Sequence, residues 1–479
     1  MSDQTAVKSV PLPRVLMVGT HQGVGVSTVV LGLVVCCRRQ TIGIGSAKIG
    51  PSLAEPTHHR RVMSRLSYTL DSWLQNRKQI RESLVRLSSG TELAIFEGVG
   101  GLYDSLGSDS AFATQAELAK FLGAPVVLVV DARGYAESIA AEVFGFCNYD
   151  PQVQIAGVIA NRVKNDEHNQ LLKAAIESLG GPAYLGGVAV GDPHQTGGTL
   201  VGLHLYNPSA LTRNRVIGSG NLVQAGVDLD AFRRAASAAP ALQIDAKGSG
   251  NFSRLAKIAV ADDQAFHLTV QDNLDMIRRV GGELVAFSPI ADRKIPTGAS
   301  AIYLPGGYVQ LYAADLANNR PMLEAIRQFV HAGGLLYAEA GAIAYLSKKA
   351  TLFNGSTFEM VGVLPGAASA IIDDADVPKV IFEETSVVGE NIIGSSGDHL
   401  RGFRDNRWAL RLESPVETCL RSTERGMEGE AGNIPIPDGF APRPNVFITR
   451  LNLHWGSHPD VCRRFVENAA KASSTIVKE

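Results

Sequence analysis

The residue expected to carry a nucleophile in the second half of the chain is an alanine. Residues 335–338 predict a strand, 339–341 a sharp turn and 342–346 a helix. This order of elements is typical of a nucleophile elbow, whose tip presents a thiol or a hydroxyl to a substrate. The tip here is Ala340, which carries neither group. Covalent catalysis from this position is therefore excluded by the side chain itself.

A glycine-rich segment near the N-terminus predicts a loop that faces an anion, because it follows a buried-strand pattern and precedes a helical one. Gly23 and Gly25 would let the backbone approach a phosphate closely. Ser27 or Thr28 could reach a Mg²⁺ ion, but Val26 stands where a lysine is expected to meet the terminal phosphates. The main charge that stabilises phosphoryl transfer is then absent. The alternative is a tight strand-to-helix turn that binds no ligand.

Three charged residues in the same half of the chain lie near expected strand ends. We expect Glu97 on a loop after one strand and Asp131 at the end of another, where Mg²⁺ or substrate ligands lie in α/β folds. Capping of a loop or of a helix N-terminus is the alternative role for both carboxylates. Lys48 could partly replace the lysine that is missing at Val26, or it could be a solvated charge at a strand end.

Two groups of histidines have alternative interpretations. The basic residues 58–61 include His58 and His59, and they could bind carboxylates or phosphate or be solvated at the surface. His454 and His458 have the i, i+4 spacing with which a helix holds a metal ion. The Trp-Gly-Ser sequence between them favours a loop instead.

Alternating strand and helix patterns predict two α/β domains, the first with a doubly wound parallel sheet. Its strand patterns at residues 126–130 and 155–160 are continuous in apolar residues, as buried parallel strands are. A stretch rich in Ala, Pro, Gly and Ser separates the domains. The expected limits are a tail at 1–13, a first domain at 14–240, a linker at 241–254, a second domain at 255–470 and a tail at 471–479.

Composition and charge exclude several classes of protein. The chain has 479 residues, enough for two or three domains, and a formal net charge of −2. Such a balance gives no electrostatic basis for binding nucleic acid or a membrane surface. No apolar run reaches the roughly 18 residues of a membrane span, and the polar N-terminal segment does not match a signal peptide. The five scattered cysteines are typical of reduced thiols, so we expect a cytoplasmic protein.

Short motifs along nearly the whole chain resemble the cobyrinic acid a,c-diamide synthases, which are glutamine- and ATP-dependent amidotransferases of tetrapyrrole pathways. The resemblance implies a P-loop NTPase-like (dethiobiotin-synthetase-like) domain followed by a class I glutamine amidotransferase-like domain. The motifs lie at residues 19–25, 48–51, 70–73, 97–104, 116–120, 130–134, 161–163, 272–274, 287–289, 306–308 and 337–339.

The same resemblance implies a set of site residues. ATP with Mg²⁺ would be the cofactor, bound with reduced affinity, and a tetrapyrrole would be a possible ligand. The residues expected to bind the cofactor are Gly23, Gly25, Ser27, Thr28, Lys48, Glu97, Asp131 and Asn161. The expected metal ligands are Ser27, Glu55 and Glu97.

The departures from the family pattern fall in both domains. Val26 replaces the phosphate-loop lysine, and Ser52 and Glu55 replace two aspartates of the family's acidic segment. Ala340 replaces the glutaminase cysteine, and Asn452 replaces the first histidine of the C-terminal pattern, the presumptive base. An alanine cannot form the thioester through which glutamine is hydrolysed, so we expect no glutaminase activity.

Three functions are compatible with these residues. The first is a catalytically degenerate member of the family, a pseudoenzyme that binds, scaffolds or regulates a protein partner, such as an intact paralogue or a second copy of itself. The second is an enzyme that amidates a tetrapyrrole carboxylate of the corrin or sirohaem type with ATP and free or partner-supplied ammonia. The third is a tetrapyrrole carrier or sensor, whose acid groups residues 58–61 would hold.

Overall fold

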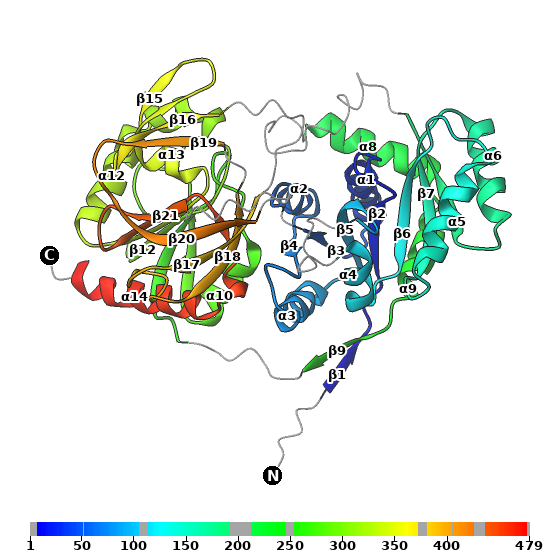
Figure 1. Ribbon diagram of the computed structural model, residues 1–479, viewed down its shortest axis with the longest axis horizontal. Helices are drawn as coiled ribbons and strands as arrows, with labels where there is room; N and C mark the ends of the chain where they lie inside the picture. The colour runs from blue at the N-terminus through cyan, green and yellow to red at the C-terminus, as the bar shows by residue number, and fades with distance from the viewer. Residues whose placement is uncertain are drawn as a thin grey trace, which may run out of the picture. The chain divides into compact units, whose positions relative to one another are not determined.

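The computed structural model describes residues 7–50, 52–104, 114–190, 212–245, 253–371, 381–404, 407–425 and 436–476. The chain forms two compact units, and the boundary between them falls between Gly248 and Ser249. In Figure 1 the first unit runs from blue to green and the second from green to red. The predicted succession of two α/β domains is therefore confirmed.

A parallel sheet is the centre of the first unit. All neighbouring strands of this sheet pair in parallel, so their carboxyl ends meet at one edge of the sheet. Its order is β4 (Ser67–Leu70), β3 (Ile44–Ile49), β5 (Leu93–Gly101), β2 (Arg14–Gly19), β6 (Val126–Asp131), β7 (Ile155–Val163) and β8 (Ala183–Ala189).

Apolar clusters cover both faces of this sheet, because successive strand residues point to opposite sides. On β2, Leu16 and Val18 belong to one buried cluster, and Val15 and Met17 to another. The described helices of the unit are α1 (Val26–Arg39), α2 (Ala54–Met63), α3 (Arg77–Ser88), α4 (Gln115–Leu122), α5 (Ile139–Tyr149), α6 (Asp166–Glu177), α8 (Arg213–Gly226) and α9 (Leu229–Ser237).

The segments expected to be tails and linker contain regular structure. β1 (Val7–Val10) lies in the expected N-terminal tail and pairs antiparallel with β9 (Leu242–Asp245), in the expected linker. Both strands have only four residues and mix polar with apolar types, so neither shows the continuous apolar pattern of a buried strand. Helix α14 (Asp460–Ile476) likewise runs into the expected C-terminal tail.

The second unit contains a ten-stranded mixed sheet. Its first five strands pair in parallel, and the pairings beyond them are antiparallel. The order is β11 (Gly282–Phe287), β10 (Ala256–Ala261), β12 (Ala301–Leu304), β13 (Leu335–Glu339), β22 (Val446–Thr449), β21 (Ile436–Ala441), β20 (Glu417–Arg425), β17 (Ile381–Val387), β18 (His399–Arg404) and β23 (Asn452–Leu453).

A second, four-stranded sheet and several helices complete this unit. The sheet has the order β15 (Thr357–Glu359), β14 (Ser347–Thr351), β16 (Leu364–Ala370) and β19 (Trp408–Leu412). Among the described residues, no helix is both long and apolar enough to span a membrane. The helices before α14 are α10 (Gln271–Arg279), η3 (Val309–Leu311), α11 (Ala313–Asn318), α12 (Arg320–His331), α13 (Ala342–Leu346) and η4 (Trp455–Ser457).

Candidate functional site

The glycine-rich loop connects the end of β2 to the start of α1, as the sequence predicts. Gly23 and Gly25 have φ angles of 89° and 96°, in the region that disfavours other residues. A Cβ on Gly25 would also lie 2.1 Å from the Asn161 Nδ2 atom. Gly25 is the N-cap of α1 and offers no side-chain cap, and the first turn holds no acidic residue. The first turn of α1 therefore has no acidic side chain of its own to oppose the helix dipole.

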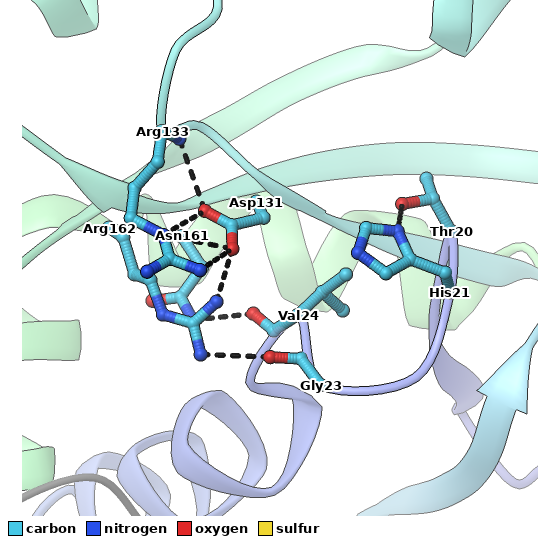
Figure 2. Close-up of polar contacts among 8 residues, drawn as sticks. All are labelled: Thr20, His21, Gly23, Val24, Asp131, Arg133, Asn161 and Arg162. Carbon is cyan, nitrogen blue, oxygen red and sulfur yellow. Dashed lines mark hydrogen bonds and ion pairs between the residues drawn. The ribbon is translucent and has the colours of Figure 1, made fainter.

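Two side chains of β7 hold the loop by its carbonyl groups (Figure 2). The Asn161 Nδ2 atom donates to the Val24 carbonyl at 2.7 Å, and the Arg162 Nη2 atom donates to the Gly23 carbonyl at 2.8 Å. The Asn161 amide thus contacts the loop itself. With two loop carbonyls bound from this side, the loop has a defined conformation.

Asp131 ends β6 and binds two arginines (Figure 2). Arg133 donates to it from its backbone at 3.1 Å and from its guanidinium at 2.8 Å, and Arg162 forms a second ion pair with the same carboxylate. Burial opposes ionisation, but the Arg133 hydrogen bonds and the Arg162 charge lower the Asp131 pKa overall. Asp131 therefore caps its own turn, as one alternative predicted, and also anchors a residue that contacts the loop.

The buried carboxylate of Glu97 contacts three other candidate residues, Ser27, Lys48 and His59. The Glu97 Oε1 atom accepts hydrogen bonds from Ser27 Oγ at 2.6 Å and from Lys48 Nζ at 2.8 Å. The Glu97 Oε2 atom lies 3.0 Å from His59 Nε2. Burial favours the neutral carboxyl, but the Lys48 charge and the His59 contacts prevail and lower the pKa of Glu97 far below its usual value. Glu97 is therefore an anion at neutral pH, compensated inside the protein.

The geometry of this cluster corrects three expectations. Glu97 lies within β5, and not on the loop after the strand, because the strand continues to Gly101. Lys48 is only 3% exposed, so it is not a solvated strand-end charge. His58 and His59 are buried, whereas Arg61 is exposed, so the four basic residues do not form one surface cluster.

The remaining predicted residues of the first unit lie at the N-termini of α1 and α2. Val26 is the first residue of α1, and the Thr28 N–H donates to the Gly25 carbonyl at 3.1 Å within the first turn. Glu55 lies in α2, but its side chain is outside the described part of the structure. Ser27 and Glu97 offer a hydroxyl and a carboxylate, oxygen ligands of the kind that suit Mg²⁺ beside a bound nucleotide.

The predicted elbow forms in the second unit. β13 ends at Glu339, α13 begins at Ala342, and Ala340 between them has a φ angle of 48°. The Ala340 N–H donates to the Thr449 carbonyl at 2.9 Å. A left-handed residue other than glycine is strained, and strain of this kind is typical of a nucleophile position. The backbone thus keeps the geometry of an elbow at a residue without a reactive atom.

Asn452 lies beside the tip of the elbow. A Cβ placed on Gly306 would lie 2.9 Å from Asn452 Oδ1 and 3.4 Å from Ala340 Cβ, so the two side chains approach the same point. The Oδ1 atom is buried and has no hydrogen-bond partner among the described residues. Asn452 and Ala340 are therefore placed together, as expected for the positions of a base and a nucleophile.

Next to the elbow, Glu339 is fully buried. Its carboxyl group accepts hydrogen bonds from Tyr303 at 2.9 Å, from Tyr337 and from the Leu453 N–H at 3.2 Å. Burial raises the pKa of Glu339 to about 7, although the tyrosine hydrogen bonds oppose this shift. This carboxyl group changes its ionisation near neutral pH and was not singled out in the sequence.

His454 and His458 do not share a helical face. His454 precedes the short helix η4 and lies 3.9 Å from Asp272, and His458 forms an ion pair with Asp398 at 3.1 Å. Within the described ranges, no group of three or more His, Cys, Asp and Glu side chains is arranged to hold a metal ion. The prediction that His454 and His458 lie on one face of an α-helix and bind a metal ion is therefore wrong. The two residues flank a single short 3₁₀ turn, which is closer to the predicted loop.

Comparisons with known proteins give matches to the second unit and to nearly the whole chain. Residues 257–386 match the model of a CobB/CobQ-like glutamine amidotransferase domain. A cobyrinate a,c-diamide synthase of Syntrophotalea carbinolica is 31% identical over 456 residues, which cover 95% of this chain and 98% of that relative. This chain belongs to the cobyrinate a,c-diamide synthase family.

Other relatives of the same name span both units of this family member. The protein from Salmonella typhimurium is 30% identical over 464 residues, covering 95% of this chain and 98% of its own length. The protein from Leptospira interrogans, serovar copenhageni, is 28% identical over 465 residues, covering 97% of this chain and the whole relative. The similarity therefore includes the glycine loop of the first unit as well as the elbow of the second.

Two residues of the candidate site had no specific role in the sequence analysis. Arg162 was only part of a family motif, and nothing in a linear pattern shows that its guanidinium reaches Gly23, 139 positions away. His59 was grouped with its basic neighbours, and only the fold separates it from them by placing it on Glu97. Both roles depend on contacts between segments that are distant in sequence: His59 of α2 contacts β5, and Arg162 of β7 contacts the glycine loop.

Proposed function

We propose that this chain amidates a tetrapyrrole carboxylate with ATP and takes ammonia, not glutamine, as its nitrogen source. The observation that carries the proposal is the alanine at the tip of a fully formed elbow, next to an asparagine whose Oδ1 atom has no hydrogen-bond partner among the described residues. Glutamine hydrolysis needs a nucleophile and a base at these two positions, and neither side chain can serve. The relatives named cobyrinate a,c-diamide synthase support a tetrapyrrole carboxylate as the acceptor.

Several groups of the first unit support such a ligase. Phosphoryl transfer from ATP activates the carboxylate, ammonia displaces the phosphate, and the products are the carboxamide, ADP and phosphate. The loop and the N-terminus of α1 would bind the phosphates through backbone N–H groups. Ser27 and Glu97 would hold Mg²⁺, which neutralises phosphate charge when bound. Lys48 is hydrogen-bonded to Glu97, one member of this pair.

The test is an assay of amide formation with cobyrinic acid, Mg-ATP and either ammonium chloride or glutamine, with products separated and weighed by mass spectrometry. We expect amidated product and ADP with ammonia, and no product above background with glutamine. Equal product from glutamine would contradict the loss of glutaminase activity. No product from either nitrogen source, with intact Mg-ATP binding, would reject the ligase and leave a binding function.

A regulatory pseudoenzyme is the second candidate, and one observation favours it. Lys48 donates to Glu97 and to the Gly98 carbonyl at 3.1 Å, so its charge is already used inside the protein. Without a lysine at Val26, little positive charge would then face the terminal phosphates. Under this hypothesis the chain binds a partner, such as an intact paralogue or a second copy of itself. Native mass spectrometry of the protein from its own cells would reveal such a partner, and a bare chain that also amidates cobyrinic acid would exclude this candidate.

A further inference from the structure

Arg162 connects the glycine loop to the end of the neighbouring strand, and we propose that it is a positioning residue for anion binding. Its guanidinium donates to the Gly23 carbonyl at 2.8 Å and pairs with the Asp131 carboxylate at the same time (Figure 2). A planar guanidinium can hold two acceptors in a fixed relation, which a single ammonium cannot do. The role rests on the proposed function, because the anion in question is the polyphosphate of a nucleotide.

The backbone of Arg162 supports this role. Its φ angle is 61°, a left-handed conformation that is uncommon for a residue with a long side chain. Glycine would adopt this conformation without strain. Strained residues persist where the surrounding structure requires them, and they are concentrated at functional sites. In this left-handed conformation the Arg162 side chain reaches the glycine loop, so the strained backbone and the contact with Gly23 occur together.

Arg162 binds the glycine loop through a carbonyl group, and not through an N–H group that could face an anion. Arg162 and Asn161 bind the carbonyl groups of Gly23 and Val24, and these contacts fix the orientation of the peptide groups between Gly23 and Gly25. Gly23 and Gly25 both have positive φ angles, so the loop has other conformations available once it is released. Holding the carbonyls on one side favours the conformation in which N–H groups face the anion.

The chain offers a matched control for this residue. Arg133 also pairs with Asp131, at 2.8 Å, but among the described residues its hydrogen bonds go to Asp131 and not to the glycine loop. Its side chain is 67% exposed, compared with 20% for Arg162. Removal of Arg133 therefore takes one arginine from the same carboxylate and leaves the loop contact in place.

The experiment compares Arg162→Gly and Arg162→Lys with Arg133→Ala in the full-length protein. Glycine accepts the left-handed conformation, so Arg162→Gly should fold with an unchanged thermal midpoint. Hydrogen exchange, followed by mass spectrometry without any ligand, should become about tenfold faster at residues 20–28 in Arg162→Gly. Arg133→Ala should exchange like the unsubstituted protein. Unchanged exchange in a folded Arg162→Gly variant would overturn the proposal.

Binding measurements separate this role from a general structural one. Inorganic tripolyphosphate and ATP should both bind Arg162→Gly about tenfold more weakly, while adenosine affinity stays constant, because the contact acts on the loop. Arg162→Lys should recover part of the loss, since lysine keeps one donor. Equal weakening of adenosine binding would contradict a role at the phosphates. If the unsubstituted protein binds no tripolyphosphate, the proposed function fails, and the ligand-free exchange still decides whether Arg162 holds the loop.

Discussion

The glycine loop of the first unit and the elbow of the second unit each lack their most reactive expected residue, but their surroundings differ. Around Val26, the charged side chains meet opposite charges: Glu97 binds Lys48 and His59, and Asp131 binds two arginines. Around Ala340, the Asn452 Oδ1 atom is buried with no hydrogen-bond partner among the described residues. In the first region the buried charges are paired, although the His59 Nδ1 atom also lacks a hydrogen-bond partner among the described residues. In the second region the unsatisfied Asn452 Oδ1 atom lies directly beside the tip of the elbow.

The two regions therefore differ in what surrounds the replaced residue: an unsatisfied polar atom at Ala340, and paired charges near Val26. A buried polar atom without a partner costs free energy, so natural proteins keep few of them. Asn452 is one of these exceptions, and its Oδ1 atom lies beside the tip of the elbow. In the first region, the buried charges of Glu97 and Lys48 compensate each other. The comparison predicts that chemistry can be rebuilt at the elbow, whereas changes at Glu97 should first affect stability.

The largest expected effect is the return of glutamine hydrolysis. Ala340→Cys combined with Asn452→His would place a thiol and a base at neighbouring positions of an existing elbow. Release of glutamate from glutamine should rise at least about 100-fold above the unsubstituted protein, and far less for Ala340→Cys alone, because a thiol needs a base. A coupled glutamate assay measures this.

A matched control places the cysteine elsewhere in the same region. Ala344→Cys with Asn452→His adds the same two groups, but the cysteine then lies within α13 and not at the tip of the elbow. This variant should remain at background. Activity in the control, or glutamate release by the unsubstituted protein, would show that the elbow does not define the lost site.

A smaller effect is expected on stability when the buried ion pairs of Glu97 with Lys48 and His59 are broken. Glu97→Gln leaves Lys48 and His59 buried without their anion, and we expect a loss of about 3–5 kcal/mol in the free energy of unfolding. Glu359→Gln removes the partner of Lys349 in an exposed ion pair and should cost less than about 1 kcal/mol. Urea unfolding of the three proteins gives both values. A loss at Glu97 as small as the control would mean that the network is not the compensated unit described above.

The smallest expected effect is a pH dependence in the second unit. Because burial raises the pKa of Glu339 to about 7, the folded state holds this proton more tightly than the unfolded chain, whose value is 4.5. The resulting stabilisation is complete below about pH 4.5 and is lost as the pH rises through 7, by roughly 3 kcal/mol in total. Glu339→Gln cannot ionise, so its stability relative to the unsubstituted protein should increase between pH 5 and pH 8. Thermal midpoints across this range measure it, and parallel curves for the two proteins would show that Glu339 does not titrate there.

Local sequence patterns determined much of the fold and one decisive chemical fact. The helix at 342–346 has the predicted limits, and the strands predicted at 126–130, 155–160 and 335–338 all form and continue one to three residues further, because each has a continuous apolar pattern. The absence of a nucleophile at Ala340 needs no structure, since alanine has no reactive atom in any fold. The short pair β1 and β9 could not be predicted, because each strand is defined by its partner more than 230 residues away.

Tertiary structure alone decided how the charged residues are used. The sequence shows Lys48, His59 and Glu97 as separate candidates, and the parallel sheet brings them together because β3 and β5 are neighbours and α2 follows β3. Burial then turns Lys48 from a surface charge into the partner of an internal anion. The link from Arg162 to Gly23 likewise exists only because β7 and the glycine loop meet at the carboxyl edge of the sheet. Ionic and hydrogen-bond partners are set by distances in space, which a linear pattern of residue types does not contain.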